Sequence, residues 1–281
     1  MKYTFVSLGR LESIGVRLGG AGLGNILFPW AYALVYAKKH NCKRIQTTWK
    51  NLKIGTFLRK ERDKRMYFDL FTERDGISGF KKFWLLNFSN KVKYFKGMDE
   101  MFSPFKNEQA YVKQELLKIV TPFHLEKANG FNINSIGVHI RMGDFEDPEK
   151  EQLLRDGAWS YRLPMKWYLS IVKKLRAQTN LPIYVFSDAN NEDLIDILQL
   201  ENCKRAYLGS AISDMIALSK CKVLVSSAST FSMWASFLGQ MPTIWFPGQM
   251  RQKLIHNNKV FEGEIDYDEK LPESIIQLIY K

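Results

Sequence analysis

Hydrophobic positions in the second half of the chain fall into short runs, which alternate with segments of helical periodicity. The run IGVHI at 136–140 is uninterrupted and rich in β-branched residues, as in parallel strands that are buried on both faces. Comparable runs follow at 182–187, 222–227 and 242–246, and 204–208 is a candidate for a further short strand. Because helical segments lie between these runs, the pattern predicts a doubly wound parallel sheet with Rossmann-like topology.

The helices of this half are predicted from capping residues and from apolar periodicity. Pro164 is expected to open a helix through 165–178, since proline is favoured at the first helical position. A second helix is expected through 192–200, and Ser213 is expected to cap a third. A fourth should begin in the serine-rich turn that follows the strand at 222–227.

The first half of the chain has a weaker pattern. An apolar, strand-like run at 3–8 precedes a glycine loop and a helical stretch from about 25 to 39. The segment from 42 to about 129 is basic and rich in aromatic residues, and its periodicity places few elements. We therefore predict two domains, residues 1–128 and residues 129–281.

Composition indicates a folded protein that meets a negatively charged partner. Hydrophobic residues make up 46% and charged residues 25% of the 281 positions, which is typical of globular proteins. The net charge of +12 fits a nucleic acid, an anionic membrane or a nucleotide-charged substrate. No apolar run has the length of a membrane span, and Arg10 and Glu12 interrupt the stretch where a signal peptide would be apolar. We expect a cytoplasmic protein.

Basic residues cluster in two segments, 59–65 and 76–98. The second contains five lysines and no acidic residue, and large apolar or aromatic residues are interleaved with the lysines. The lysines are Lys81, Lys82, Lys91, Lys93 and Lys96. Such a segment suits the surface of an anionic bilayer, and we predict peripheral contact with the inner face of the cytoplasmic membrane through 76–98. The alternative is that the aromatic residues belong to the core and the lysines to a solvated face.

The first chemical motif is GGAGLGN at 19–25, between a strand-like run and a helix. Gly22 and Gly24 let a backbone approach a ligand closely and adopt φ > 0, and a helix N-terminus favours phosphate. The side-chain amide of Asn25 is placed to reach such a group. The motif fits a structural turn as well as a phosphate loop, and it lacks the GxGxxG spacing of dinucleotide-binding proteins.

The second motif is HIRMGD at 139–144, where a buried strand ends. Ligands of such sheets bind at the carboxyl ends of the strands. The guanidinium of Arg141 forms a planar fork that matches phosphate oxygens, and Asp144 is spaced to orient it. Ser187 and Asp188 occupy the corresponding position after the strand at 182–187.

The third motif spans 214–238, in which a helix, a strand and a serine-rich turn lead into another helix. The turn brings the hydroxyls of Ser227, Ser229, Thr230 and Ser232 to a helix start. Backbone N–H groups at a helix start and nearby hydroxyls make a second phosphate cradle plausible. Ordinary helix capping is the competing interpretation.

Together the three motifs resemble those of the α-1,2-fucosyltransferases, glycosyltransferase family 11, and more distantly those of α-1,6- and protein O-fucosyltransferases. GAGLGN stands where the family has GGLGNQ, with Ile26 in place of the glutamine. HIRMGD matches HxRRxD except that Met142 replaces the second arginine, and STFSxW is intact at 229–234. The resemblance covers most of the chain, including YVFSDA at 184–189, but gives no guide between about 42 and 125.

The resemblance implies a GT-B-like α/β fold, with two Rossmann-like domains facing a cleft and GDP-fucose held mainly by the second. Arg141 would contact the β-phosphate and His139 the ribose or guanine side of GDP. Asp214 would accept hydrogen bonds from guanine N1 and N2, and Asn25 would reach the diphosphate. The full set implied for donor binding is Gly22, Gly24, Asn25, His139, Arg141, Asp188, Asp214, Ser229, Thr230 and Phe231.

The resemblance also implies an inverting reaction that uses no cofactor and no metal, with catalysis by Arg141 and Asp144. The chain does contain one Asp-x-Asp, Asp266–Asp268, which we interpret as part of a solvated acidic surface near the C-terminus. Inversion requires a proton acceptor for the attacking hydroxyl. Asp144, Glu146 and Asp147 are candidates, and the sequence does not choose among them.

The expected acceptor is a glycan, either a terminal galactoside attacked through its 2-hydroxyl or a lipid-linked oligosaccharide. One alternative is a related glycosyltransferase that uses another GDP-sugar, which the substitutions at Ile26 and Met142 motivate. A second alternative is a basic nucleic-acid-binding protein, motivated by the net charge of +12. The chain has no recognisable nucleic-acid-binding module, which argues against it.

Overall fold

The computed structural model describes residues 2–8, 21–50, 67 and 69–280, together with the backbone of 16–17 and 52–53. The chain divides into two compact units, Met1–Leu125 and Glu126–Lys281. The division falls within helix α5 (Pro122–Asn129), as does the predicted boundary after residue 128. The predicted α/β class is confirmed, because both units contain parallel sheets with helices. The basic cluster at 59–65 and the first two glycines of the loop lie outside the described residues.

The second unit is built on a six-stranded parallel sheet. Its strands are β6 (Ile136–Ile140), β7 (Ile183–Ser187), β8 (Cys203–Arg205), β9 (Val223–Val225), β10 (Thr243–Trp245) and β11 (Glu262–Glu264). They lie in the order β11-β10-β9-β6-β7-β8. This is the Rossmann order, in which the direction of winding reverses between the first and fourth strands, here β6 and β9. The predicted doubly wound sheet is confirmed; its edge strand β11 was missed because Glu262–Glu264 lacks an apolar run.

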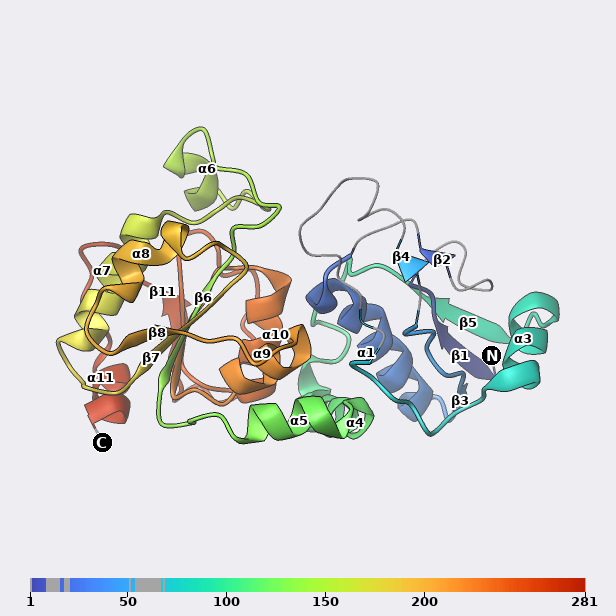
Figure 1. Cartoon of the computed structure of the whole chain (residues 1–281). Coiled ribbons are helices and arrows are strands. Elements are labelled where there is room, and N and C mark those ends of the chain that lie inside the picture. The colour runs from blue at the N-terminus through green and yellow to red at the C-terminus, as the bar shows by residue number, and fades with distance from the viewer. Residues whose placement is uncertain are drawn as a thin grey trace. The chain divides into compact units, whose positions relative to one another are not determined.

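Helices cover both faces of this sheet (Figure 1). The helices α7 (Met165–Arg176), α8 (Ile195–Leu198) and α11 (Glu273–Tyr280) lie on one face, and α9 (Ala211–Leu218) and α10 (Thr230–Gly239) lie on the other. Along β6, Val138 and Ile140 belong to the core cluster that contains α7 and α11. Gly137 faces the α9 side, where an added Cβ would lie 2.5 Å from Leu218 Cδ1. Because strand residues alternate in direction, His139 faces the side of α9 and α10.

The predicted helix starts were mostly right. Pro164 precedes α7, as expected, and α10 begins at Thr230 with Ser229 as its N-cap. The N-cap assigned to Ser213 was wrong, because Ser210 caps α9 and accepts a hydrogen bond from Ser213 N at 3.2 Å. Both serines have hydroxyls of the capping type, so residue type alone does not choose between them.

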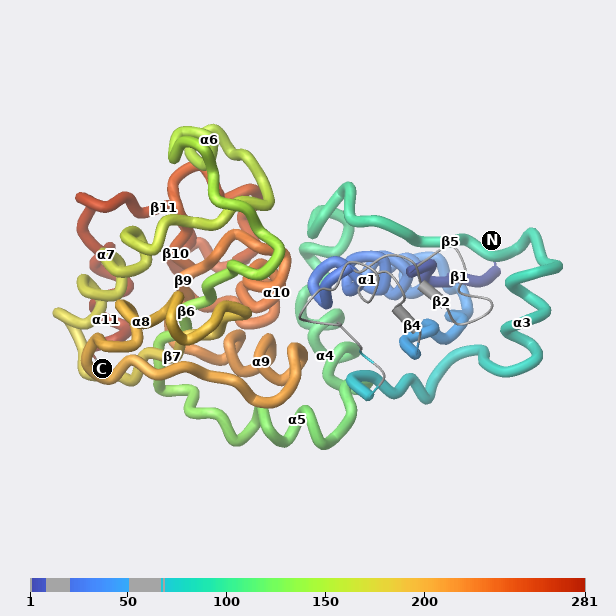
Figure 2. Tube along the Cα trace, turned by 45° about the horizontal axis from the view of Figure 1, so that its top comes forward, coloured from blue at the N-terminus to red at the C-terminus, as the bar shows by residue number. Residues whose placement is uncertain are grey.

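The first unit contains a smaller sheet in the order β3-β1-β5. These strands are β1 (Tyr3–Val6), β3 (Lys43–Arg44) and β5 (Val92–Phe95), all parallel, and β2 (Val16–Arg17) pairs separately with β4 (Leu52–Lys53). Helix α1 (Leu23–Lys39) packs on β1 and β5 (Figure 2). Helix α3 (Gly79–Phe88) packs on the opposite side, where Leu85 meets Phe5 and Val92. Helix α4 (Gln109–Ile119) leads to α5. The predicted first strand and first helix are thereby confirmed.

Candidate active site

The carboxyl ends of β6, β7 and β9 bring several of the predicted site residues to one edge of the sheet. Arg141 follows β6 directly, Asp188 follows β7, and the turn of residues 226–229 follows β9. Strands β7 and β9 are the two neighbours of β6. The edge between β6 and β9 is also where the strand order reverses, which is the usual ligand position in an open α/β sheet.

His139 is a buried, neutral side chain at this edge, with 6% of its surface exposed. Its Nδ1 lies 2.7 Å from Ser227 Oγ, and its ring stacks on Phe231 with ring centroids 4.8 Å apart. Burial lowers its pKa to about 3, with the Arg141 charge adding to the effect and Asp188 opposing it. Because Ser227 Oγ donates to Ser229 Oγ, it accepts from Nδ1, so His139 Nε2 keeps a lone pair.

The guanidinium of Arg141 is held by two carboxylates. One terminal nitrogen bonds Asp144 Oδ1, and the other lies 2.5 Å from Asp188 Oδ2. The ring of Phe145 lies 5.3 Å from the guanidinium carbon. The side chain is 23% exposed, so the arginine is oriented but still accessible. It has five N–H donors, of which these pairs occupy two, and the others remain available for an anion.

Gly143, which was not among the predicted site residues, makes this arrangement possible. A Cβ at position 143 would lie 2.2 Å from Asp188 Oδ2, so any larger residue would displace that carboxylate. The other oxygen of Asp188 accepts a hydrogen bond from Met142 N at 2.8 Å. Asp188 therefore fixes both the backbone and the arginine of HIRMGD. In the sequence, the glycine within HIRMGD was the one signal of this close approach by Asp188.

The hydroxyls of the serine-rich turn are occupied with one another. Ser226 Oγ donates to Ser232 Oγ at 2.9 Å, and Ser227 Oγ donates to Ser229 Oγ at 2.9 Å. All four serines are buried. Ser229 also caps α10 by accepting from Ser232 N at 3.5 Å. The structure favours the capping interpretation for these hydroxyls over direct contact with a ligand.

The backbone of the same turn is strained, which is common at functional sites. Ala228 has φ +58°, in the left-handed region that non-glycine residues rarely adopt. The turn delivers the chain into α10, whose first turn contains Thr230 and Phe231. Amides in the first turn of a helix point away from it and carry partial positive charge, so they suit a phosphate.

Asp214 lies in the first turn of α9, the helix that packs against α10. Its Oδ1 accepts a hydrogen bond from Leu208 N at 2.7 Å. Burial raises its pKa to about 7, and the Leu208 hydrogen bond offsets part of that rise. The carboxyl therefore changes charge near neutral pH, and donors that approach it favour its ionised form.

The glycine loop residues belong to the first unit, at the start of α1. Gly22 is the N-cap, and its carbonyl accepts from Asn25 N at 3.1 Å. The expectation of φ > 0 was wrong for Gly22, whose φ is −66°, and Gly24 is a helical residue. Among the atoms of the described residues, none lies within 4 Å of a Cβ built on Gly22.

The Asp-x-Asp segment has a structural role that the sequence did not predict. Both oxygens of Asp266 bond Arg155, at 2.6 and 2.9 Å, and this contact lowers the pKa of Asp266. Asp266 follows β11, so it too lies after a strand end. The interpretation of a merely solvated acidic run is therefore corrected. Among the residues that the structure describes, no group of three or more His, Cys, Asp or Glu side chains is arranged as a metal site.

The model of the family described as Glycosyl transferase family 11 matches residues 24–249. Galactoside alpha-(1,2)-fucosyltransferase 1 of Ateles belzebuth is 20% identical over 206 residues, which cover 71% of this chain and 51% of the relative. O-antigen biosynthesis glycosyltransferase WbnK of Escherichia coli is 30% identical over 159 residues, 51% of this chain and 50% of the relative. The chain spans about half the length of these curated relatives.

Two solved structures are similar in outline. The crystal structure of POFUT1 in complex with GDP covers 87% of this chain and 98% of its own, with 12% identity and a TM-score of 0.47. A mutant of Arabidopsis thaliana FUT1 in complex with GDP covers 87% of this chain and 70% of its own, with 16% identity and a TM-score of 0.48. At these TM-scores the assignment rests on the match to the family model, which extends over most of the sequence. The chain belongs to glycosyl transferase family 11.

Proposed function

We propose that this protein is a galactoside 2-alpha-L-fucosyltransferase, which moves L-fucose from GDP-fucose to the 2-hydroxyl of a terminal galactoside with inversion. Family membership and the activity for which the Ateles belzebuth relative is named support the reaction. The observation that carries the proposal is the position of Arg141. It lies at the carboxyl end of β6, and the N-terminus of α10 follows the neighbouring strand β9.

This placement suits the charge that develops during transfer. As the bond from fucose to the β-phosphate breaks, negative charge accumulates on the departing GDP. Arg141 is held by Asp144 and Asp188 before substrate arrives, so its guanidinium needs no reorganisation. The amides of Thr230 and Phe231 add a second positive pole. Donors fixed in this way stabilise the transition state more than the ground state.

The remaining donor contacts follow from the geometry of each side chain. His139 Nε2, with its lone pair, would accept a hydrogen bond from a ribose hydroxyl. Asp214 would accept from guanine N1 and N2, and binding those two donors would ionise it. Asn25 and Gly24, in the first turn of α1, and its N-cap Gly22 remain proposed contacts of the donor diphosphate. Ser229 would act through the cap of α10, since its hydroxyl is already bonded within the turn.

For the attacking hydroxyl we propose no single base. Asp144 is bonded to Arg141, and that ion pair favours a positioning role for it over proton transfer. Glu146 and Asp147 follow on the same loop, and Asp147 pairs with Arg162 at 3.2 Å. The reaction we propose needs no metal and no cofactor, because Arg141 and α10 supply the positive charge that a cation would provide.

A terminal galactoside or a lipid-linked oligosaccharide is the proposed acceptor. The O-antigen biosynthesis enzyme among the relatives supports an acceptor for a surface polysaccharide. We place the reaction on the cytoplasmic side, with peripheral contact at the inner face of the membrane, where a lipid-linked acceptor is presented. Within the described residues, no helix has the length and apolar character needed to cross a bilayer.

Transfer to a related acceptor from another GDP-sugar is the second candidate, favoured by Met142 in place of the second arginine. Assays of GDP release with GDP-fucose, GDP-mannose and GDP-glucose, each with and without a β-galactoside, separate the two. We expect acceptor-stimulated release with GDP-fucose only, and a product with an α-1,2 linkage by NMR. Equal or faster turnover of another GDP-sugar would overturn the choice of donor, and a different linkage the choice of hydroxyl.

A further inference from the structure

Helix α3 presents an aromatic face to solvent. Phe80, Phe83, Trp84 and Phe88 follow the spacing i, i+3, i+4 and i+8, which places them on one side of a helix. They are 81%, 51%, 50% and 69% exposed, respectively. Neighbouring rings of this face lie near one another, with centroids 6.5 Å apart for Phe80 and Phe83. Exposed apolar groups that share one face mark an interaction site more often than isolated ones do.

The opposite face of α3 is the one that packs against the sheet, and it contains a lysine. Lys82 Nζ donates to Gln46 O at 2.7 Å and to Thr48 Oγ1 at 2.8 Å. Leu85, only 3% exposed, packs beside it on Phe5. A surface helix normally turns its apolar side inward and its charges outward. Because α3 turns four aromatic residues outward, its outer face suits an apolar partner.

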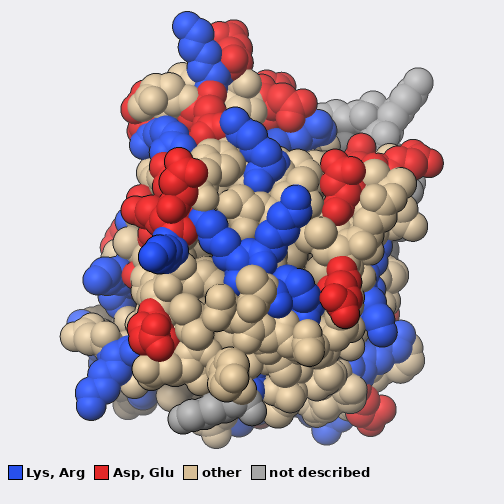
Figure 3. All heavy atoms as spheres, turned by 90° about the vertical axis from the view of Figure 1, so that its left-hand side faces the viewer, with Lys and Arg blue, Asp and Glu red and all other residues tan. Residues whose placement is uncertain are grey.

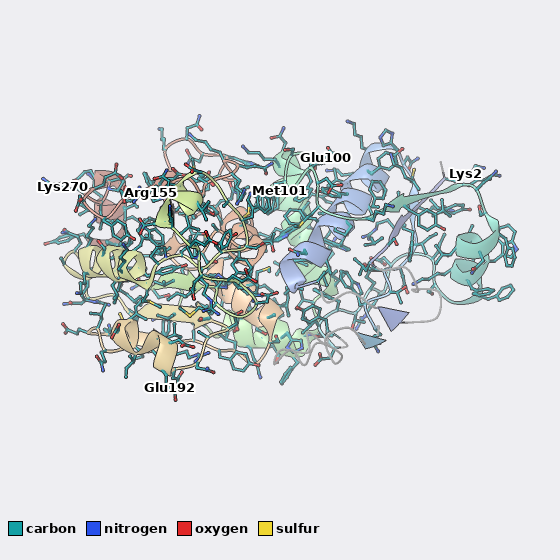
Figure 4. The ribbon with its side chains drawn as sticks, turned by 90° about the horizontal axis from the view of Figure 1, so that it is seen from above. Lys2, Glu100, Met101, Arg155, Glu192 and Lys270 are labelled. Carbon is teal, nitrogen blue, oxygen red and sulfur yellow. The ribbon has the colours of Figure 1, made fainter. Side chains whose placement is uncertain are left out.

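Exposed lysines lie on α3 and at the amino-terminal end of the sheet against which α3 packs. Lys81 on α3 and Lys91 directly before β5 are exposed, whereas the exposed Lys96 follows the opposite end of β5. Lys2 N donates to Lys91 O at 3.1 Å, and Lys43 N donates to Lys2 O at 3.0 Å, so strand pairing adds two exposed lysines at the same end of the sheet. Figure 4 shows Lys2 at the α3 end of the first unit.

The segment 76–98 has no acidic residue. The face of the second unit seen in Figure 3, by contrast, has Asp and Glu distributed among its Lys and Arg. Aromatic residues with flanking lysines and no acidic residues suit an anionic bilayer surface. The rings enter the interfacial region, and the ammonium groups bind the lipid phosphates.

We propose that the outer face of α3, defined as Phe80, Phe83, Trp84 and Phe88 with the flanking Lys2, Lys43, Lys81 and Lys91, binds the surface of an anionic lipid bilayer. Lys82 and Lys93 are excluded from this surface. Lys82 bonds the protein's own backbone, and Lys93 Nζ lies 4.0 Å from the centre of the Tyr36 ring. The inference concerns lipid binding alone, so it can fail while the proposed transfer reaction holds, and the reverse.

The test is co-sedimentation of the whole protein with vesicles of phosphatidylglycerol and phosphatidylcholine, compared with vesicles of phosphatidylcholine alone. We expect binding to the anionic vesicles that weakens as salt rises. Replacing Trp84 and Phe80 with Gln should abolish it. Each single change of Lys81, Lys91 or Lys2 to Gln should weaken partitioning about fivefold. Phe123, 60% exposed on α5, and Lys204, exposed on β8, provide matched controls whose Gln variants should bind normally.

Two outcomes would overturn the proposal. One is equal sedimentation of the wild type and the Phe80→Gln/Trp84→Gln variant, with both proteins folded by circular dichroism. The other is a concentration-dependent dimer in light scattering that the same variant converts to a monomer, with no vesicle binding, since α3 would then contact a second copy. GDP release in detergent-free solution, measured on the same variants, should match the wild type and keeps lipid binding separate from transfer.

Discussion

Two arginines at the carboxyl edge of the second unit's sheet have the same kind of surroundings, since each pairs with two carboxylates. Arg141 pairs with Asp144 and Asp188. Arg155, the last residue of α6 (Glu151–Arg155), pairs with Glu151 and Asp266. Both guanidinium groups also lie over a phenylalanine ring, at 5.3 and 5.4 Å. The local contacts alone do not say which arginine serves a ligand.

The surroundings separate them. Around Arg155 the partners are themselves bonded, since Tyr267 Oη donates to Glu151 at 3.0 Å and Lys166 lies 2.9 Å from the same carboxylate. This closed network joins α6 to the chain after the edge strand β11. Arg141 instead lies where the strand order reverses. The neighbouring strand there is β9, and the chain leads from β9 into the start of α10. An arginine–carboxylate pair thus marks a site only in combination with its position on the sheet.

The largest effect should come from Arg141→Ala, which tests the functional half of this comparison. Loss of one fixed donor to the departing GDP should lower kcat by about 10²–10³-fold. Arg141→Lys should recover little, because a point charge does not replace the planar fork. Steady-state GDP release measures both variants, and thermal unfolding establishes that they fold. Wild-type turnover by folded Arg141→Ala would remove Arg141 from the site.

The next largest effect is the pH dependence expected from Asp214, which lies in the first turn of α9, the helix that packs against α10. With a pKa of about 7 in the free protein, the carboxylate that guanine needs is about tenfold scarcer at pH 6 than at pH 8, so GDP affinity should fall about tenfold between them. Calorimetric titration of GDP measures this. Asp214→Asn should flatten the profile and bind weakly throughout. Affinity that does not change with pH in the wild type would contradict the assignment.

The same raised pKa has the opposite sign for stability. The folded chain holds the Asp214 proton more tightly than the unfolded chain, whose carboxyl titrates near 3.8. The contribution of Asp214 to the free energy of unfolding should therefore fall as pH rises from about 4 to about 7. Urea unfolding of wild type and Asp214→Asn across this range should differ in slope.

Arg155→Ala tests the structural half of the comparison. The pair is partly exposed, so its removal should lower the free energy of unfolding by only about 1 kcal/mol and leave kcat within about twofold of wild type. Denaturant unfolding and the GDP-release assay measure the two quantities on one preparation. If Arg155→Ala were as inactive as Arg141→Ala while still folded, position on the sheet would not distinguish the two arginines.

The smallest effect is expected from metal removal. Excess EDTA should leave turnover unchanged, because the proposed positive charge comes from Arg141 and α10, and because Asp266 is bonded to Arg155. If activity required manganese or magnesium and were lost in Asp266→Asn, the functional site would lie at Asp266 and not at Arg141.

Much of the second unit could be predicted from the sequence. The run 136–140 became β6 with the same bounds, and α7 and α10 begin where their capping residues indicated. These elements depend on local patterns of apolar and capping residues. The glycine loop was located correctly, but its backbone was not, because a glycine permits φ > 0 without requiring it. Strand β11 was missed because its pairing with β10 lies in backbone hydrogen bonds, which side chains do not encode.

In the candidate site, the sequence by itself determined which side chains can do the chemistry: Arg141, His139, Asp188 and Asp214. Only the tertiary structure decided how each one is used. Strand pairing of β6 with β7 brings Asp188 to Arg141 across 47 positions of sequence, and burial makes His139 neutral and holds Asp214 near its titration point. Residue type fixes the functional groups, but charge state and partners depend on distance and desolvation, which exist only once distant segments have packed together.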